Sequence, residues 1–240
     1  MISMSHTIAE RLQKTLTRIE KATTQYGRQR DEVQLIAVSK TQTADSLRTA
    51  YSLGQRHFGE NYLQEALDKM TRLSDCNITW HFIGSIQSNK TKIIAEKFNW
   101  VHSIDRLKIA QRLNNARPED LEPLNVCLQV NISEENTKSG INASDIHELA
   151  HQVATLPKLR LRGLMALPAA YENFEQQRTS FATLKQQFDE LKQSGLPLDT
   201  LSMGMSNDLE AAIAEGATLV RIGSAIFGPR IKKPLDAGTI

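Results

Sequence analysis

The stretch Leu35-Ile36-Ala37-Val38-Ser39-Lys40 is a short apolar run that ends on a lysine. Such a run, with β-branched residues and polar neighbours, predicts a buried strand. A lysine cannot stay in a dry core as a bare ammonium, so we expect Lys40 where the strand opens onto a cleft. In parallel α/β proteins that place is the carboxyl end of the strand, where ligands bind. A partly desolvated lysine there is an amine nucleophile fit for a Schiff base, and the alternative is a surface lysine that ends a strand.

Strand and helix patterns alternate along the whole chain. An amphipathic helix is expected first, over residues 5–26. The expected strands are 33–40, 56–59, 78–83, 100–103, 124–132, 159–165, 198–202 and 218–222. The expected helices that follow them are 44–53, 61–73, 90–97, 106–115, 144–155, 174–193, 208–214 and 224–227. We expect Ser144 to cap its helix and Phe174 to face the core.

This alternation predicts the fold class. A parallel sheet follows from the order of the elements, and eight β/α units in 240 residues predict a closed (β/α)8 barrel of the TIM type. An open doubly wound sheet is the alternative, but no G-x-G-x-x-G follows the first strand to support a dinucleotide site. No linker rich in Pro, Gly or Ser divides the chain, so residues 1–240 are expected to form a single α/β domain with an extra N-terminal helix.

The composition excludes several classes of protein. The chain has 29 Lys and Arg residues against 27 Asp and Glu, a net charge of +2, which argues against binding of nucleic acid or a membrane surface. Cys76 and Cys127 have neither metal-ligand spacing nor a disulfide framework, which suits a reducing cytosol. The first residues lack the pattern of a secretory signal, and no apolar run approaches the roughly 18 residues of a membrane span. We therefore expect a cytoplasmic protein, and we expect a monomer.

Polar residues at the expected strand ends would form the ligand-binding face of the barrel. Backbone amides at Gly223 and Ser224, after the last strand, can approach a phosphate at the start of a short helix. Ser206 can cap the expected helix 208–214, which comes before the last strand, and can offer its hydroxyl to the same phosphate. Asp208 and Glu210 in the first turn of that helix would repel an anion on its axis, so we place the phosphate nearer Gly223 and Ser224. An ordinary strand-to-helix turn is the alternative.

Histidines give no second site in this interpretation. His81 lies among aromatic residues, where a packed core histidine is commoner than a catalyst. His147 and His151 are four residues apart on one helix but lack a His-Glu-x-x-His pattern, so we expect them at the surface. No residues have metal-ligand spacing and no Gly-x-Ser-x-Gly elbow is present, so we predict no metal and no serine nucleophile.

Five motifs carry a resemblance to a known family. They are the stretch 35–40, His57-Phe58-Gly59-Glu60-Asn61-Tyr62, Trp80-His81-Phe82-Ile83-Gly84 with Gln87-Ser88-Asn89-Lys90, Ser202-Met203-Gly204-Met205-Ser206 and Arg221-Ile222-Gly223-Ser224-Ala225-Ile226-Phe227-Gly228. In this order the sequence resembles the pyridoxal phosphate homeostasis protein family (YggS/PROSC type). The resemblance implies a barrel related to the N-terminal domain of alanine racemase and pyridoxal 5′-phosphate (PLP) as cofactor. Phosphate contacts would fall on Ser206, Gly223 and Ser224.

The resemblance also implies roles for the residues around the ring. Lys40 would hold PLP as a Schiff base, a covalent aldimine, while Arg221 would face the pyridine nitrogen and Asn61 would lie near the ring. An arginine cannot give up its proton, so the nitrogen would stay unprotonated and the ring would be a weak electron sink. The related racemases draw a second base, a tyrosine, from a C-terminal β domain, and this chain stops at Ile240 with no such domain. We therefore expect little or no racemase activity and an exposed cofactor.

An open cofactor site suits a protein that stores PLP and passes it to PLP-dependent apo-enzymes, with effects on amino-acid and keto-acid balance. No residue is then catalytic, and Lys40 captures and releases the aldehyde by imine exchange. Lys138 is either an acceptor during release or a solvated loop lysine, and Lys232 and Lys233 are either a second PLP contact or solvated charge. Two alternatives stay open: a racemase-like PLP enzyme acting on amino acids, and a barrel enzyme acting on a phosphorylated sugar.

Overall fold

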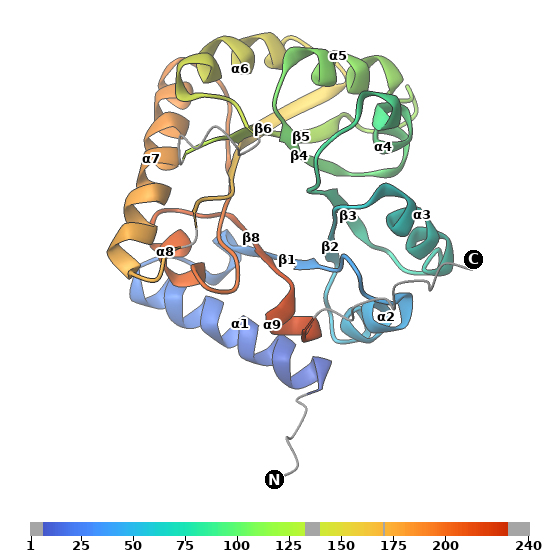
Figure 1. The fold of residues 1–240 in the computed structure, drawn as a ribbon, viewed down its shortest axis with the longest axis vertical. Helices are drawn as coiled ribbons and strands as arrows, with labels where there is room; N and C mark the ends of the chain where they lie inside the picture. The colour runs from blue at the N-terminus through green and yellow to red at the C-terminus, as the bar shows by residue number, and fades with distance from the viewer. Residues whose placement is uncertain (1–6, 133–139, 170, 230–240) are drawn as a thin grey trace, which may run out of the picture.

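The structure is a computed structural model that describes residues 7–132, 140–169 and 171–229. Within this part of the chain, eight parallel strands close into a barrel in the order β1-β2-β3-β4-β5-β6-β7-β8, and β8 is hydrogen-bonded to β1. Helices surround the strands in Figure 1. The predicted (β/α)8 barrel is confirmed. Lys138, Lys232 and Lys233 lie outside the described residues, so the predictions for them stay open.

The elements lie close to their predicted ranges. The strands are β1 (Gln34–Val38), β2 (His57–Glu60), β3 (Thr79–Phe82), β4 (Trp100–Ile104), β5 (Leu124–Val130), β6 (Leu159–Ala166), β7 (Thr200–Ser202) and β8 (Leu219–Ile222). The helices are α1 (Ile8–Gln25), α2 (Ala44–Ser52), α3 (Leu63–Arg72), α4 (Thr91–Lys97), α5 (Leu107–Ala116), α6 (Ile146–Ala154), α7 (Phe174–Gln193), α8 (Leu209–Ala214) and α9 (Ser224–Phe227). Short 3₁₀ turns cover Arg30–Glu32, Ser88–Lys90 and Ala143–Asp145.

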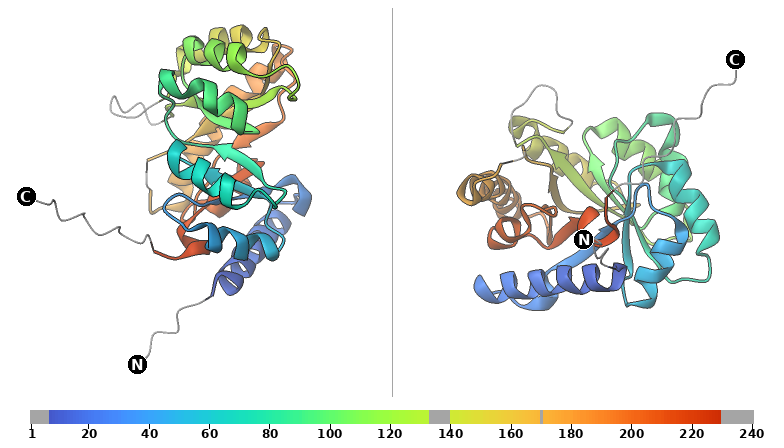
Figure 2. Two further views of the ribbon diagram at one scale, coloured as in Figure 1. Left: turned by 90° about the vertical axis from the view of Figure 1, so that its right-hand side faces the viewer. Right: turned by 60° about the horizontal axis from the view of Figure 1, so that its bottom comes forward.

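Helix α1 is the predicted extra element, and it lies outside the barrel against α8 and α9 (Figures 1 and 2). A capping box begins it: the Glu10 N–H donates to the Thr7 hydroxyl, and the Thr7 N–H donates to the Glu10 carboxylate. Arg18 pairs with Glu210 of α8 at 2.8 Å. Helix α1 is therefore joined to the segment that follows β7.

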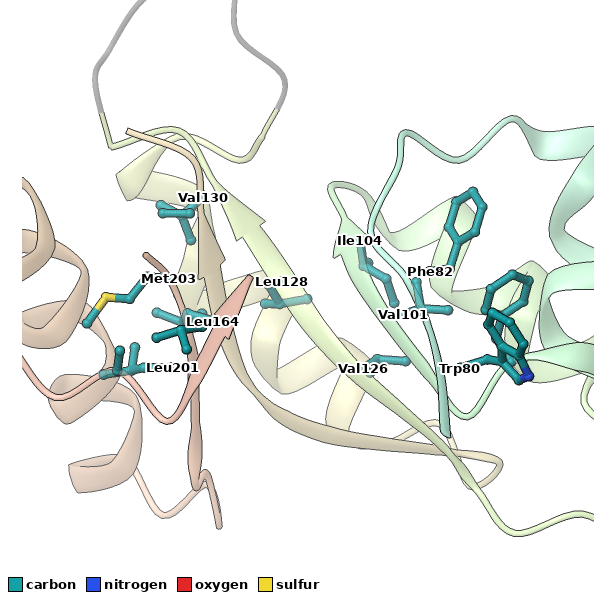
Figure 3. Close-up of a cluster of buried hydrophobic side chains, with 14 of the residues drawn as sticks. Trp80, Phe82, Val101, Ile104, Val126, Leu128, Val130, Leu164, Leu201 and Met203 are labelled. Atoms are coloured by element: carbon teal, nitrogen blue, oxygen red, sulfur yellow. The ribbon is translucent and has the colours of Figure 1, made fainter. Parts of the chain in front are cut away.

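Both faces of the strands are buried, because helices cover the outside and side chains fill the lumen. The main hydrophobic core lies between strands and helices, and Figure 3 shows part of it. Its labelled members are Trp80, Phe82, Val101, Ile104, Val126, Leu128, Val130, Leu164, Leu201 and Met203. The residues of a separate small cluster alternate with these residues along the strands. Because successive side chains of a strand point to opposite faces, this cluster lies in the lumen. It comprises Ile36, Trp100, Cys127, Met165 and Leu219.

Polar side chains occupy part of the same lumen. His81, His102 and Ser202 are 0% exposed and Arg221 is 4% exposed. Barrel lumens are usually filled by Val, Ile and Leu, so these polar residues are unusual for the fold. A fold rule broken in this way is often found at a functional site.

Two local features differ from the prediction. Ser144 does not cap α6, because it lies within a 3₁₀ turn, and its hydroxyl donates to Asp145 at 2.9 Å. Phe174 is 37% exposed, since it is the first residue of α7 and lies before the buried turns of that helix. His147 and His151 are exposed, as predicted. Among the described helices, none is long and apolar enough to cross a membrane.

Candidate functional site

A cavity of about 550 Å³ opens among the segments that follow the carboxyl ends of the strands. This volume lies in the range of small-molecule sites. Its wall draws on segments at the ends of β1, β2, β6, β7 and β8. All six residues predicted for the site line it, namely Lys40, Asn61, Ser206, Arg221, Gly223 and Ser224.

Lys40 follows β1 and is half-buried in the cavity wall. The neighbouring Ser39 is completely buried, and its N–H donates to the carbonyl oxygen of Gly59 in β2 at 2.9 Å. Thr41, on the other side, has a φ of 65°, in the left-handed region that β-branched residues rarely adopt. Such a conformation costs about 1–3 kcal/mol and persists only where the surroundings impose it. Lys40 is therefore carried on a rigid, strained turn.

A buried group of charged side chains holds this turn, and we call Lys69, Glu60 and Glu65 the charged cluster. The Lys69 ammonium, 4% exposed as a residue, donates to the Ser39 carbonyl oxygen at 2.7 Å. It also donates to Glu60 at 2.8 Å and to Glu65 at 2.6 Å. Glu65 in turn accepts the Thr41 N–H at 2.5 Å. The cluster thus fixes the backbone immediately before and after the site lysine.

Glu60 is the innermost member of the charged cluster and is completely buried. Its Oε1 accepts from the Ser39 hydroxyl at 2.6 Å as well as from Lys69. Burial raises the pKa of Glu60, while the Lys69 ammonium and the hydrogen bonds oppose that rise. Its Oε2 is buried without a hydrogen-bond partner among the described residues. The charge of Glu60 therefore depends on Lys69.

Asn61 begins the loop after β2 and reaches the cavity. The turn at Gly84 packs against it so closely that a Cβ on Gly84 would lie 2.3 Å from the Asn61 carbonyl oxygen. Only glycine fits there. The Oδ1 of Asn61 is buried, and within the described residues no donor reaches it. Because an unsatisfied buried acceptor is costly, this oxygen is a position where a ligand donor fits.

The start of α9 offers backbone donors to the cavity. Gly223 precedes the helix and Ser224 is its first residue. The first N–H groups of a helix have no partner within the helix and favour an anion. A Cβ on Gly223 would lie 3.2 Å from the Val38 carbonyl oxygen, a tight contact at the end of β1. Glycine therefore lets the last turn and the site lysine approach one another.

The two carboxylates expected to repel an anion differ in position. Glu210 points toward α1, where Arg18 donates to both of its oxygens at 2.8 Å. Asp208 lines the cavity, and its carboxylate accepts the Met205 N–H. Burial raises the pKa of Asp208, although that hydrogen bond opposes the rise. Ser206 does not cap α8 as predicted, because the helix begins three residues later, at Leu209, and Asp208 occupies the cap position.

Arg221 extends from β8 to the cavity through the lumen. Its Nη1 donates to the Ser202 hydroxyl at 2.7 Å, and its Nη2 donates to the Ala166 carbonyl oxygen at 2.9 Å. Burial lowers the pKa of Arg221 to about 10, which leaves the guanidinium protonated at neutral pH. The cavity therefore has a fixed positive charge in its wall.

Known proteins are similar to this chain in sequence and in fold. Residues 11–231 match the family model described as alanine racemase, N-terminal domain. Over 224 residues, the chain is 57% identical to the pyridoxal phosphate homeostasis protein of Pseudomonas aeruginosa, covering 93% of this chain and 96% of that one. The protein of the same name from Escherichia coli is 51% identical over 226 residues, covering 93% and 97% of the two chains. The chain belongs to the pyridoxal phosphate homeostasis protein family.

A solved structure extends this comparison. The structure of PipY from Synechococcus elongatus with PLP bound is 38% identical to this chain, with a TM-score of 0.80. The match covers 92% of this chain and 100% of that one. The barrel of this pyridoxal phosphate homeostasis family member thus has the fold of a protein whose structure contains PLP.

Some residues of this family member fall outside the predicted site. His81 does not line the cavity and is completely buried in the lumen, as the core interpretation expected. Among the described residues no group of three His, Cys, Asp or Glu side chains is placed to hold a metal. Sequence reasoning missed Leu167 and Tyr171, which line the cavity and are 40% and 36% exposed. They lie in loops, where hydrophobic periodicity carries no information.

Proposed function

We propose that this chain binds PLP in the cavity at the strand ends and serves PLP homeostasis by storing the cofactor. The observation that carries the proposal is the meeting of an amine, an anion-binding turn and an arginine in one cavity: Lys40, Gly223 and Arg221 all line it. Relatives named for pyridoxal phosphate homeostasis, and a similar structure that contains PLP, support it. We further propose that the barrel is a single PLP-binding domain.

The residues present fit this cofactor. The aldehyde requires an amine, which Lys40 supplies, and the phosphate requires backbone donors such as those at Gly223 and Ser224. The pyridine nitrogen requires a donor, which Arg221 supplies. The ring also bears a hydroxyl group, and the unsatisfied Oδ1 of Asn61 offers it an acceptor. Ser206 adds a hydroxyl to the phosphate end of the same cavity.

We propose that Lys40 holds the cofactor covalently. Its amine nitrogen bonds to the aldehyde carbon as a Schiff base, and one water leaves. When bound in this way, PLP would supply an electrophilic carbon. A second amine would form a bond to that carbon, the bond to the Lys40 nitrogen would break, and Lys40 would regain its free amine. Lys69 and Glu65 hold the backbone on either side of the site lysine, so its position does not depend on a bound ligand.

The proposed role is binding and not turnover. The guanidinium of Arg221 keeps its proton and therefore leaves the pyridine nitrogen unprotonated, which makes the ring a weak electron sink. A weak sink suits storage, because a bound amino acid is then not carried on to products. PLP-dependent apo-enzymes as recipients, the cytoplasm as location and the monomeric state remain predictions from the sequence.

Cofactor retention tests the proposal. Protein is mixed with one equivalent of PLP, desalted, scanned for imine absorbance and then mixed with an apo-enzyme whose activity needs PLP. We expect the wild type to retain PLP and to restore that activity, while Lys40→Ala retains none after desalting. Alanine racemisation should not exceed the background. Racemisation at ordinary enzyme rates would contradict the storage role, and a wild type that retains no PLP would contradict the site.

A further inference from the structure

A chain of hydrogen bonds crosses the barrel lumen and ends on Arg221. His57 Nδ1 lies 3.0 Å from His81 Nε2, and His81 Nδ1 lies 2.9 Å from His102 Nε2. His102 Nδ1 lies 2.7 Å from the Ser202 hydroxyl, which accepts from Arg221 Nη1 at 2.7 Å. The chain connects β2, β3, β4, β7 and β8, which are far apart in the sequence.

These polar side chains occupy the lumen, which apolar side chains fill in most barrels, so their presence there needs an explanation. His81, His102 and Ser202 are each 0% exposed, whereas His57, at the first position of β2, is half-buried. Buried imidazoles are tolerated only when their nitrogens are hydrogen-bonded, and both nitrogens of His81 and His102 are. A fully satisfied buried network specifies one arrangement of its members.

The donors and acceptors that these groups possess give the chain of hydrogen bonds a direction. A guanidinium only donates, so the oxygen of Ser202 must accept from Arg221. The hydroxyl proton of Ser202 then needs an acceptor, and among the described residues the other group in contact with this hydroxyl is His102 Nδ1. His102 must therefore carry its proton on Nε2 and donate to His81 Nδ1. His81 likewise donates from Nε2 to His57 Nδ1, so every donor points away from Arg221.

The charges of the rings agree with this direction. Burial lowers the pKa of His102 to about 3, and the nearby Arg221 charge adds to that effect. Burial also lowers the pKa of His81 well below its usual value, and that of His57 to a lesser degree. Each ring is then neutral at pH 7 and has one N–H, as a directed chain requires.

We propose that His57, His81, His102 and Ser202 form a directed relay that positions the guanidinium of Arg221 at the cavity. None of the four lines the cavity in the described part of the chain, so they are positioning residues. Because Ser202 donates to His102, its oxygen becomes a stronger acceptor for Arg221. The effect of the relay on cofactor binding rests on the proposed function, in which Arg221 faces the pyridine nitrogen.

The first test uses the wild-type protein without PLP. Nitrogen-15 NMR distinguishes a protonated ring nitrogen from an unprotonated one. We expect all three relay histidines to be neutral at pH 7, with the proton on Nε2 and none on Nδ1. A proton on Nδ1 of His81 or His102, or a charged ring, would overturn the relay. This outcome does not depend on whether the protein binds PLP.

The second test follows PLP in variants. His102→Leu leaves the Ser202 hydroxyl without its acceptor, and Ser202→Ala removes the acceptor of Arg221. We expect Ser202→Ala, which removes a hydrogen bond to a charged group, to weaken PLP binding about tenfold, and His102→Leu to weaken it by a smaller factor. Both variants should shift the absorbance of bound PLP. Ser202→Thr, which keeps the hydroxyl, should restore both properties. Cys127→Ala, another buried change in the lumen, should leave both unchanged.

The outcomes separate the relay from the proposed function. If the wild type takes up no PLP, the proposed function fails, and the relay is then tested only by the positions of the histidine protons in the nitrogen-15 NMR experiment. If the wild type binds PLP but His102→Leu and Ser202→Ala bind it as tightly as Cys127→Ala with the same spectrum, the relay fails and the proposed function stands. If a variant is unfolded by circular dichroism, the remaining variant and the ring protons decide.

Discussion

The buried ammonium of Lys69 donates to the carbonyl oxygen of Ser39 at 2.7 Å, one residue before the site lysine. A buried charge is costly unless it is paired, and Glu60 and Glu65 pair this one at 2.8 and 2.6 Å. Because the same contacts hold the strained Thr41, stability and site geometry depend on one cluster. This relationship makes Lys69 a residue whose loss should affect both.

Lys69→Met should destabilise the fold by about 3–5 kcal/mol, because it leaves Glu60 buried without its cation. The variant should also bind PLP more weakly than the stability loss explains, since the turn that carries Lys40 is no longer held. Urea denaturation measures the first effect. PLP titration at low urea, where the variant is folded, measures the second.

A double variant and a surface variant serve as controls for this prediction. Lys69→Met with Glu60→Gln removes both charges and should recover much of the lost stability. Lys92→Met changes a lysine whose side chain is 79% exposed and should alter neither property. Equal stability of Lys69→Met and Lys92→Met would show that the charged cluster has no structural importance.

The turn at Gly223 should discriminate PLP from pyridoxal, which lacks the phosphate. Gly223→Val introduces side-chain atoms toward the Val38 carbonyl oxygen, where even a Cβ would lie at 3.2 Å. Lost hydrogen bonds to a charged phosphate cost about 1.5–3 kcal/mol each, so PLP affinity should fall at least about tenfold. Ser206→Ala should give a smaller loss in the same direction.

Pyridoxal is the matched control ligand for the phosphate turn. Its affinity for Gly223→Val should fall less than that of PLP when both are measured by imine absorbance, because pyridoxal loses no phosphate contact. An equal loss for pyridoxal and PLP would place the effect at the ring or at Lys40, and would contradict a phosphate site at the start of α9.

The relay histidines make stability depend on pH. Burial lowers the pKa of His57, His81 and His102, the last to about 3. In the unfolded chain the pKa of a histidine is about 6.5. Below that value the unfolded chain binds more protons than the folded one, so stability rises with pH through this window and is lost on acidification. The loss should reach up to about 1.4 kcal/mol per pH unit for each histidine.

Urea denaturation between pH 5 and pH 7.5 measures this dependence. His57→Gln removes one titrating ring at the half-buried end of the relay and should reduce the slope below pH 6.5, by less than the share of one histidine in three, because the pKa of His57 is lowered less than those of His81 and His102. A wild-type stability that is constant from pH 7.5 to pH 5 would contradict neutral buried histidines.

Hydrophobic periodicity was sufficient to predict most of the fold and the residues on one side of the site. The apolar run before Lys40 and the regular spacing along α7 are local patterns, and both elements lie where they were expected. Gly223 and Ser224 could be placed near Lys40, because β1 and β8 are neighbours in any closed barrel of eight strands. These predictions need only the order of the elements.

Features that depend on register could not be predicted in the same way. The relay exists because His57, His81 and His102 fall on the lumen side of three strands, each two residues beyond the register partner of the one before, which no local pattern fixes. Lys69 was missed because a lysine on a helix is usually exposed, although its spacing of four from Glu65 was visible. Ser206 was wrongly expected to cap α8, since the helix begins at Leu209 and the N-cap position falls on Asp208, whose carboxylate accepts the Met205 N–H instead of capping the helix.

Reduction with borohydride tests the central claim most directly, because it makes a Schiff base permanent. The protein is incubated with PLP, reduced, digested and analysed by mass spectrometry. We predict one phosphopyridoxyl group per chain, on Lys40, and none on Lys40→Arg treated in parallel. A wild type that has no such group on Lys40, or that has it equally on exposed lysines such as Lys92, would contradict the account.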